Sequence, residues 1–408
     1  MQNLLQKKTP DIKKSSINET LDYIDNLWGQ LIHTNKNDKG TLIGLPHDYI
    51  IPSVQAGADF NFEEQYYWDT YFILLGLNKA KYKSLSQGMI ENLASLYKRF
   101  NMIPNASRLY FLSRSQPPLL TSMIKLFKET HGCSDNWFDE MMAIAEDEYR
   151  NVWMSEKHPH WRRVGQLNRF YDINALHDLA EAESGWDMTP RFDRKCLDYY
   201  PVDLNSLLYR YEKDFAEWYK SKGDTNTSKE WDRLAEQRAV WVDELLWGRT
   251  RKFYFDYNFV DNKRGFTWSL AGFYPMWVGM ASEERARQLV KQLVKFEKKG
   301  GLTTTSRPII DMSIFGSVKT QWAYPNGWAP LQWIVIKGLE RYGYTDDAER
   351  IAKKWLNTNT AWFIRKGELI EKYNVVSPNK EPLKGVYPDQ TGFGWTNGVY
   401  LDLANRYA

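Results

Sequence analysis

Apolar residues recur along most of the chain at the three- and four-residue spacing of helices, and short stretches of Gly, Pro or Asn interrupt them. One such stripe, within 204–219, consists of Leu207, Leu208, Tyr211, Phe215 and Trp218. The polar stretch SKGDTNTS separates it from a second helical segment at 229–246. Two helices joined by so short a turn predict an antiparallel αα-hairpin.

Further segments carry the same helical spacing. The stretch 283–296 predicts one amphipathic helix that ends at Gly300 and Gly301. The stretch 331–342 predicts a helix that pairs with 346–363 across Gly343. Alternating strand patterns are few, and the aromatic motifs fall between the predicted helices. These hairpins predict a mainly α chain, an α/α toroid of six hairpins with its active site at one mouth.

The domain organisation follows from what the chain of 408 residues lacks. It has no exact repeat, no low-complexity block and no linker rich in Pro, Gly and Ser. Residues 1–18 are polar enough to form a flexible tail. We therefore expect residues 19–408 to form a single domain.

Composition and charge exclude several classes of protein. Hydrophobic residues make up 43% and charged residues 26% of the chain, and the mean hydropathy is −0.60. No apolar run reaches the roughly 18 residues that cross a bilayer. The 54 basic and 51 acidic residues are interspersed, whereas nucleic-acid binders cluster their basic charge on one face. We expect a monomer that binds neither membrane nor nucleic acid.

Targeting, redox and metal signals are weak. The start, MQNLLQKKTPDIKKSS, has no apolar segment with a cleavage site, which predicts a cytoplasmic protein. Cys133 and Cys196 lack metal-ligand spacing and are expected to be free thiols. His158 and His160 have no recognisable third ligand, so a loop is favoured over zinc. The segment GFGWTNG at 392–398 does not fit a phosphate loop. We expect no metal and no cofactor.

Two distant segments combine aromatic rings with carboxylates and amides. They are FEEQYYWDTYF at 62–72 and QWAYPNGWAP at 321–330. Pyranose rings present apolar C–H faces edged by hydroxyls, so a sugar site needs flat aromatic walls and hydrogen-bonding side chains. The segments therefore predict carbohydrate chemistry.

Hydrolysis of a glycosidic bond needs two carboxyl groups in unlike settings, one protonated and one ionised. Asp187 lies in ESGWDMTPRF, where Gly185 allows close backbone approach. Trp186 can desolvate the Asp187 carboxyl and so raise its pKa, as a general acid requires. The alternative interpretation is a loop with an N-cap Asp, which the Gly-Trp-Asp triplet alone favours.

Two other carboxyl groups have competing interpretations. Glu371, in GELIEKYNV, stands between a short apolar stretch and a loop, and taken alone it predicts a solvated side chain beside Lys372. Asp69 follows Trp68 in an aromatic enclosure. That setting fits a sugar-contacting carboxylate and a hydrogen-bonded core Asp equally well.

A polar loop and three tryptophans are also ambiguous. Arg114 lies with Ser and Gln before a Pro-Pro pair at 117–118, which favours the start of a helix. Such a loop either projects donors into a pocket or holds Arg114 in a salt bridge. The rings of Trp322, Trp328 and Trp395, judged singly, favour core packing over ligand contact.

Taken together and in order, these segments resemble the trehalase family, the inverting α-glucosidases with an α/α toroid fold that split α,α-trehalose into two glucose molecules. The resemblance extends from about residue 40 to the C-terminus. It rests on seven ordered motifs: FEEQYYWDTYFILLGL, IPNASRLYFLSRSQPP, LNRFYD, SGWD, QWAYPNGWAPLQ, IEKYNV and GFGWTNGV.

The resemblance implies roles for individual residues. Asp187 would be the general acid and Glu371 the general base that activates water, with their carboxyl groups roughly 6.5 to 9.5 Å apart as inversion requires. The residues implied to hold the nonreducing glucose are Trp68, Asp69, Asn105, Arg114, Ser115, Gln116 and Gly185. Further aromatic rings expected to contact the sugar substrate are those of Phe62, Trp322, Trp328 and Trp395.

The chain also departs from the family pattern at four places. Asn61 stands where the family has an arginine, Ala323 replaces an aspartate, and Val386 replaces a glutamate. Only fourteen residues separate Asp172 from Asp187, so a longer family segment is missing. Polar sites discriminate strongly because unpaired partners are costly. We therefore expect hydrolysis of trehalose or of a closely related α-linked disaccharide or glycoside.

Two rival hypotheses remain at this stage. The altered contacts also fit a catalytically weak sugar-binding or regulatory protein on a degenerate trehalase scaffold. A helical interaction scaffold is the weaker rival, because the aromatic clusters are interleaved with hydrogen-bonding groups and do not form an apolar stripe.

Overall fold

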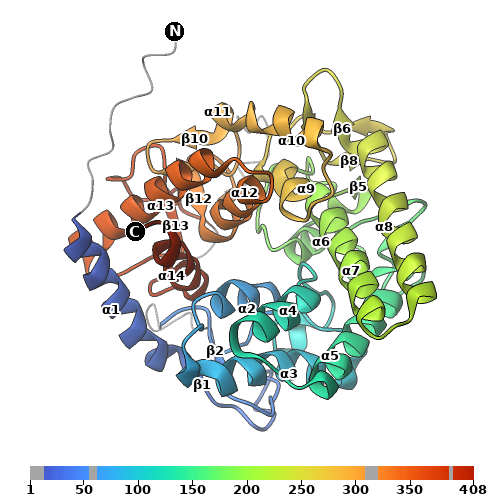
Figure 1. The fold of residues 1–408 in the computed structure, drawn as a ribbon, viewed down its shortest axis with the longest axis horizontal. Helices are drawn as coiled ribbons and strands as arrows, with labels where there is room; N and C mark the ends of the chain where they lie inside the picture. The colour runs from blue at the N-terminus through green and yellow to red at the C-terminus, as the bar shows by residue number, and fades with distance from the viewer. Residues whose placement is uncertain (1–12, 55–61, 308–319, 386–388) are drawn as a thin grey trace.

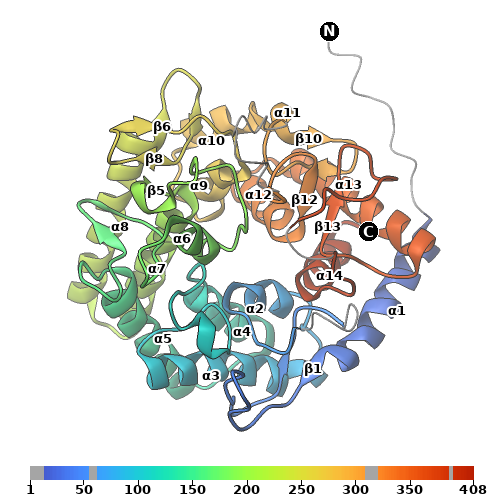
Figure 2. The ribbon, with the colours of Figure 1, turned by 180° about the vertical axis from the view of Figure 1, so that it is seen from behind.

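The computed structural model describes residues 13–54, 62–307, 320–385 and 389–408. Helices dominate these segments and form an inner and an outer ring (Figures 1 and 2). The α-helices are α1 (Lys14–Leu31), α2 (Tyr67–Leu74), α3 (Lys83–Phe100), α4 (Leu120–His131), α5 (Asp135–Glu148), α6 (His177–Glu183), α7 (Val202–Ser221), α8 (Thr225–Leu246), α9 (Tyr274–Trp277), α10 (Glu283–Val290), α11 (Leu293–Phe296), α12 (Ala329–Arg341), α13 (Thr345–Lys366) and α14 (Gly394–Tyr407).

The inner ring closes on itself. Helix α2 packs on α4, α4 on α7, α7 on α9, α9 on α12 and α12 on α14, and α14 returns to pack on α2. Helices α1, α3, α5, α8, α10 and α13 lie outside this ring (Figure 1). The predicted fold, mainly α and an α/α toroid, is confirmed.

The two rings differ in how they bury their residues. All eight residues of α2 are buried, so this helix has no polar face. The outer helix α1 keeps a single buried stripe, formed by Thr20, Ile24, Leu27, Trp28 and Leu31. A helix enclosed on all sides loses the 3.6-residue pattern. For this reason the sequence-based placement of the aromatic motifs between helices was partly wrong: Trp68 and Asp69 lie in α2, and Trp395 lies in α14.

Both predicted hairpins form. Helices α7 and α8 pack along each other, and α8 begins at Thr225, earlier than expected, because Asp224 caps it by accepting a hydrogen bond from the Thr227 backbone N–H at 3.0 Å. Helices α12 and α13 pack together across Gly343, whose φ of +75° suits glycine.

One sequence-based helix boundary was wrong. The single helix expected at 283–296 is divided into α10 and α11 by a tight turn in which the Gln292 N–H donates to the Leu289 carbonyl at 2.8 Å. Leu289, Leu293 and Phe296 stay buried on both sides of this turn, so the apolar stripe survives the division. The tail expected at 1–18 overlaps α1, which begins at Lys14, and residues 1–12 lie outside the described segments.

Short antiparallel strands join the helices. The pairing of β12 with β13 places Trp328 opposite Lys372 and so brings Glu371 beside the segment that precedes α12. The strands are β1 (Ile32–His33), β2 (Tyr49–Ile50), β3 (Arg163–Val164), β4 (Leu167–Asn168), β5 (Tyr199–Tyr200), β6 (Trp247–Gly248), β7 (Phe253–Tyr254), β8 (Tyr257–Asn258), β9 (Lys263–Arg264), β10 (Glu297–Lys298), β11 (Gly301–Leu302), β12 (Asn326–Trp328) and β13 (Lys372–Asn374).

Candidate active site

The predicted site residues gather at one end of the inner ring. Asp69 lies in the first turn of α2, Arg114 shortly before α4, Trp328 directly before α12 and Trp395 in the first turn of α14. The later turns of the same helices line a cavity of about 500 Å³ that none of these residues reaches. Several inner helices therefore present their N-terminal ends, with their partial positive charge, to the candidate site.

The loop that carries Asp187 is fixed by contacts on both sides. Gly185 has a φ of +74°, and a Cβ at this position would lie 2.8 Å from the Trp68 ring. The ring of Trp186 stacks on Trp322 with centroids 5.5 Å apart. The Gln321 side-chain amide donates to the Asp187 carbonyl at 2.8 Å. Gly185 is therefore needed both for the turn and for the close approach of the two segments.

The Asp187 carboxyl group is held in a setting that favours its neutral form. Its Oδ1 atom is buried and makes no hydrogen bond with the described residues. Burial raises the pKa of Asp187 to about 6, the Arg114 guanidinium opposes this rise, and the charge of Glu371 adds to it. Desolvation without a bonded partner is the usual means of keeping a carboxylic acid protonated at moderate pH.

The Glu371 side chain is more deeply buried than that of Asp187, and it has a cationic partner. Glu371 is 1% exposed, so the interpretation of it as a solvated side chain was wrong. Its backbone carbonyl accepts hydrogen bonds from the Trp395 indole at 3.2 Å and from the Thr396 hydroxyl. Its Oε2 lies 3.0 Å from the Lys372 ammonium, which also contacts Asp389 at 2.7 Å. Glu371 and Lys372 thus form a buried ion pair.

Asp69 joins these two carboxyl groups. It is 4% exposed in the first turn of α2. Burial and the charge of Glu371 raise its pKa well above the ordinary value, and the charge of Asp187 adds to the rise. Three carboxyl groups from distant parts of the chain thus interact electrostatically at one place. We refer to Asp69, Asp187 and Glu371 as the carboxyl triad.

Arg114 combines both interpretations that the sequence left open. Its guanidinium lies 3.4 Å from Asp172 Oδ2, which also accepts a hydrogen bond from the Ser113 hydroxyl at 2.7 Å. Its charge also lowers the pKa of Asp187, so it lies within electrostatic reach of the triad. The salt bridge therefore orients a cation toward the carboxyl groups.

Asn105, Ser115 and Gln116 hold the loop before α4 in place. The Gln116 amide oxygen accepts from the Trp68 backbone N–H at 3.0 Å, and the Asn105 amide donates to the Ser115 carbonyl at 3.2 Å. The Ser115 hydroxyl donates to the Ile103 carbonyl at 2.6 Å. These bonds show how the loop is fixed, and contact of the three side chains with a sugar stays a prediction.

The predicted tryptophans form one cluster of rings. The Trp68 ring lies 5.9 Å from that of Trp322 and 5.7 Å from that of Trp395, and Trp322 stacks on Trp328 at 3.7 Å. All four rings are at most 4% exposed. The Trp395 indole connects the cluster to the Glu371 backbone, and contact of the rings with a sugar stays a prediction.

The remaining sequence predictions have mixed outcomes. Phe62 packs edge-to-face on Phe393, with ring centroids 6.2 Å apart. Its contact with a sugar stays a prediction. Ala323 is buried beside the tryptophan cluster. Asn61 and Val386 lie outside the described residues. No group of three or more His, Cys, Asp or Glu side chains in the described segments could hold a metal ion.

Sequence reasoning missed several residues that organise the site. Glu183 accepts hydrogen bonds from the Ser115 and Tyr171 backbone N–H groups, both at 2.7 Å, and forms a buried ion pair with Arg162. Glu181 accepts from the Thr189 N–H, and burial raises its pKa to about 8. Both glutamates precede SGWD directly, which was the available signal. The sequence placed Lys372 next to Glu371 but did not indicate their ion pair.

Comparison with known proteins agrees with this arrangement of the site. The trehalase family model matches residues 3–184 and 174–408. The chain belongs to the trehalase family. It is 34% identical to a periplasmic trehalase of Xanthomonas campestris pv. campestris, over 98% of this chain and 76% of that protein. It is also 32% identical to a probable trehalase of Eremothecium gossypii, over 100% of this chain and 64% of that protein. Membership makes this trehalase-family protein an O-glycosyl hydrolase.

Solved structures give the same picture. The neutral trehalase Nth1 from Saccharomyces cerevisiae superposes with a TM-score of 0.76 and 28% identity, covering 98% of this chain and 81% of that one. A mannosylglycerate hydrolase from Thermus thermophilus, in complex with glucose, has a TM-score of 0.65 and 17% identity, covering 95% of this chain and 99% of that one. The second likeness is one of fold alone.

Proposed function

We propose that this trehalase-family protein hydrolyses α,α-trehalose to two glucose molecules with inversion, with Asp187 as general acid and Glu371 as general base. The observation that carries this proposal is the contrast between two buried carboxyl groups. Among the described residues, Asp187 has no hydrogen-bond partner at its Oδ1, and burial raises its pKa to about 6. Glu371 lies 3.0 Å from an ammonium. One group is suited to give a proton and the other to take one.

The reaction follows from these two states. Asp187 donates its proton to the glycosidic oxygen as the bond to the anomeric carbon breaks. Glu371 removes a proton from a water molecule, which attacks the anomeric carbon from the opposite face. Arg114 stabilises the Asp187 carboxylate that is left behind. Asp69 and the aromatic rings of the cluster would orient the sugar.

The test is proton NMR of the initial products of trehalose cleavage. Inversion releases one β-glucose, from the attacked ring, and one α-glucose, from the leaving group. Equal amounts of both anomers at early times are expected. Early product that is entirely α-glucose would show retention and contradict the mechanism.

Two substitutions test the assigned roles. Asp187→Asn and Glu371→Gln keep the volume of each side chain, and each should lower kcat by about 10²- to 10⁴-fold. Asp178→Asn, an exposed carboxyl on α6, is the matched control and should retain full activity. Near-normal turnover in a well-folded Asp187→Asn or Glu371→Gln protein would remove that residue from the mechanism.

The substrate range is a separate part of the proposal. Ala323 and the short segment between Asp172 and Asp187 alter groups on which trehalose recognition in the family would depend. We expect a panel of α-glucosides to show cleavage of trehalose or of a closely related α-linked disaccharide. Saccharide binding without glucose release over long incubation would favour the degenerate-scaffold alternative.

The compartment and the assembly state are also proposals. In the segments that the structure describes, no helix has the length and hydropathy of a membrane span. The sequence led us to expect a cytoplasmic monomer, whereas the Xanthomonas relative is named a periplasmic trehalase. Fractionation of native cells tests the compartment, and light scattering of the purified protein tests the assembly state.

A further inference from the structure

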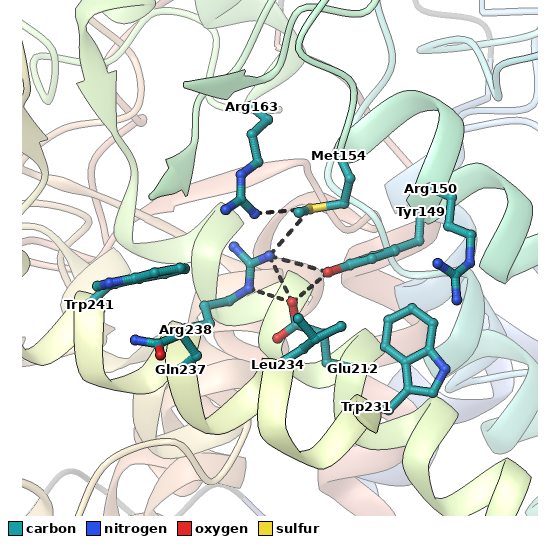
Figure 3. A pocket seen from close by; sticks show the side chains of 10 residues that line it. All are labelled: Tyr149, Arg150, Met154, Arg163, Glu212, Trp231, Leu234, Gln237, Arg238 and Trp241. Atoms are coloured by element: carbon teal, nitrogen blue, oxygen red, sulfur yellow. Dashed lines mark hydrogen bonds and ion pairs between the residues drawn. The ribbon is translucent and has the colours of Figure 1, made fainter. Parts of the chain in front are cut away.

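A cavity of about 280 Å³ lies outside the inner ring, between α8, α7 and the π-helical turn Tyr149–Trp153 that extends α5 (Figure 3). Helix α8 contributes a stripe of side chains at steps of three and four residues: Trp231, Leu234, Arg238 and Trp241. The π-helical turn, which is a rare element often found at functional sites, contributes Tyr149 and Arg150. The cavity shares no lining residue with the carboxyl triad.

A buried ion pair between Glu212 and Arg238 lines this cavity, and one carboxylate oxygen of Glu212 has no hydrogen-bond partner among the described residues. Glu212 Oε1 accepts hydrogen bonds from the Arg238 Nε at 2.8 Å and from the Tyr149 hydroxyl at 2.6 Å. Glu212 Oε2 is buried and has no hydrogen-bond partner among the described residues. A buried acceptor without a hydrogen bond destabilises the folded state. The site therefore favours an occupant that donates a hydrogen bond.

The wall opposite Glu212 offers donors. The Arg163 Nε donates to the Gly165 carbonyl at 3.1 Å, and its nearest carboxylate, that of Glu156, is 3.9 Å away. Burial and the charge of Arg238 lower the pKa of Arg163, so an acceptor beside it would be stabilising. Figure 3 shows Arg163 above the Arg238–Glu212 pair, facing the same space.

Apolar surface completes the cavity. Trp241 is partly buried and lies under the Arg163 guanidinium, 5.7 Å from its ring centroid, while Leu234 is 37% exposed at the rim. Trp231 and Trp241 stand on either side of the central ion pair in the view of Figure 3. Aromatic rings beside a carboxylate and a guanidinium match the C–H faces and paired hydroxyls of a pyranose.

We propose that this cavity is a second carbohydrate-binding site that takes one neutral hexose ring, such as glucose. A hydroxyl of the ring would donate to Glu212 Oε2, and a neighbouring hydroxyl would accept from Arg163. The unpaired carboxylate oxygen would repel a purely anionic ligand. An apolar ligand would leave both Glu212 and Arg163 without a hydrogen-bond partner in the cavity. The cavity lies near the lower limit of about 300 Å³ for small-molecule sites, which suits a single ring.

The test observes the cavity directly. The wild-type protein is labelled with 5-fluorotryptophan, the Trp241 and Trp161 signals are assigned with the variants Trp241→Phe and Trp161→Phe, and glucose is titrated while the ¹⁹F spectrum is recorded. The Trp241 signal should shift and saturate. Trp161 is the matched control, because it is 45% exposed and also pairs with an arginine, Arg169, but lies outside the cavity. Its signal should not move.

Two variants make the result decisive. Glu212→Gln and Arg163→Met should each weaken the saturation of the Trp241 signal by at least tenfold. Arg163→Met leaves the buried Glu212–Arg238 pair intact, so it remains informative if Glu212→Gln does not fold. An unmoved Trp241 signal, or a shift that is linear in glucose and equal in wild type and Arg163→Met, would overturn the inference.

This inference does not depend on the proposed hydrolysis, and the two fail separately. Trehalose cleavage is measured on the same labelled preparation. A saturable Trp241 shift without cleavage would keep the second site and remove the proposed function. Cleavage without a Trp241 shift would keep the proposed function and remove the second site.

Discussion

At the scale of single residues, the decisive difference between Asp187 and Glu371 lies in the neighbours of each carboxyl group. Asp187 has a desolvated oxygen and a distant guanidinium, whereas Glu371 touches the Lys372 ammonium at 3.0 Å. Desolvation favours a neutral acid, and a contacting cation favours an ionised base. The division of labour between two chemically similar groups is therefore set by what surrounds each one.

The first residue-scale prediction concerns pH. A general acid must be protonated, so kcat/KM should fall as pH rises through about 6, the pKa to which burial raises Asp187. Arg114→Met removes a charge that lowers this pKa, so the midpoint of the fall should move to higher pH even though activity is lower. A pH–rate profile of both proteins measures this. Midpoints that coincide would show that Asp187 does not control the alkaline limb.

The same pKa has a consequence for stability. In the unfolded chain an Asp carboxyl has a pKa of about 4, so between about pH 4 and pH 6 the folded protein binds more protons than the unfolded chain. The contribution of Asp187 to the free energy of unfolding is therefore full below this window and is lost as pH rises through it.

The second residue-scale prediction concerns Lys372. Lys372→Met should lower kcat by about tenfold or more, because the ammonium that holds the Glu371 carboxyl in place is lost. Breaking a buried pair should also cost about 3 to 5 kcal/mol of stability. Lys366→Met, which removes an exposed pair with Glu381 at 3.2 Å, is the control and should change neither quantity measurably. An unchanged kcat in a folded Lys372→Met protein would show that Lys372 does not position the base.

At the scale of elements, the turn before Asp187 depends on a glycine. Gly185→Ala would strain a φ of +74° and place a Cβ 2.8 Å from the Trp68 ring. We expect kcat to fall at least tenfold, because the loop must move and takes Asp187 with it. Gly132→Ala is the control, since its φ is +69° but nothing lies within 4 Å of the added Cβ. Its activity should be normal, and equal kcat in both variants would refute the argument.

The elements also show what the sequence can reveal. Helix α8 was predicted because it leaves one face in solvent and so keeps an amphipathic stripe, and α7 was predicted because its apolar residues from Leu207 to Trp218 still recur at helical spacing. Helix α2 was not predicted, because all its residues are buried and no amphipathic stripe remains. Asp187 and Glu371 were identified through a family resemblance, since each alone favoured an ordinary role. The roles of Lys372 and Glu183 depend on tertiary contacts, which local patterns do not contain.

At the scale of the whole molecule, the contact between α2 and α14 closes the ring. A Cβ on Gly398 of α14 would lie 2.0 Å from the Phe72 carbonyl oxygen of α2. Gly398→Ala should therefore lower the free energy of unfolding by about 3 kcal/mol or more. Gly29→Ala in α1 has open space around the added Cβ and should raise stability by about 0.5 to 1 kcal/mol. Chemical denaturation measures both, and a neutral Gly398→Ala would mean that the helices separate easily.

The seam between α2 and α14 joins the earliest and the latest inner helix to be synthesised. During translation, the side of α2 that packs on α14 has no partner. Its apolar side chains stay exposed until the residues of α14 have left the ribosome. Pairing over such a long sequence separation is slow. The nascent chain is therefore an open arc during this interval, and the ring closes only when its last helix docks on α2.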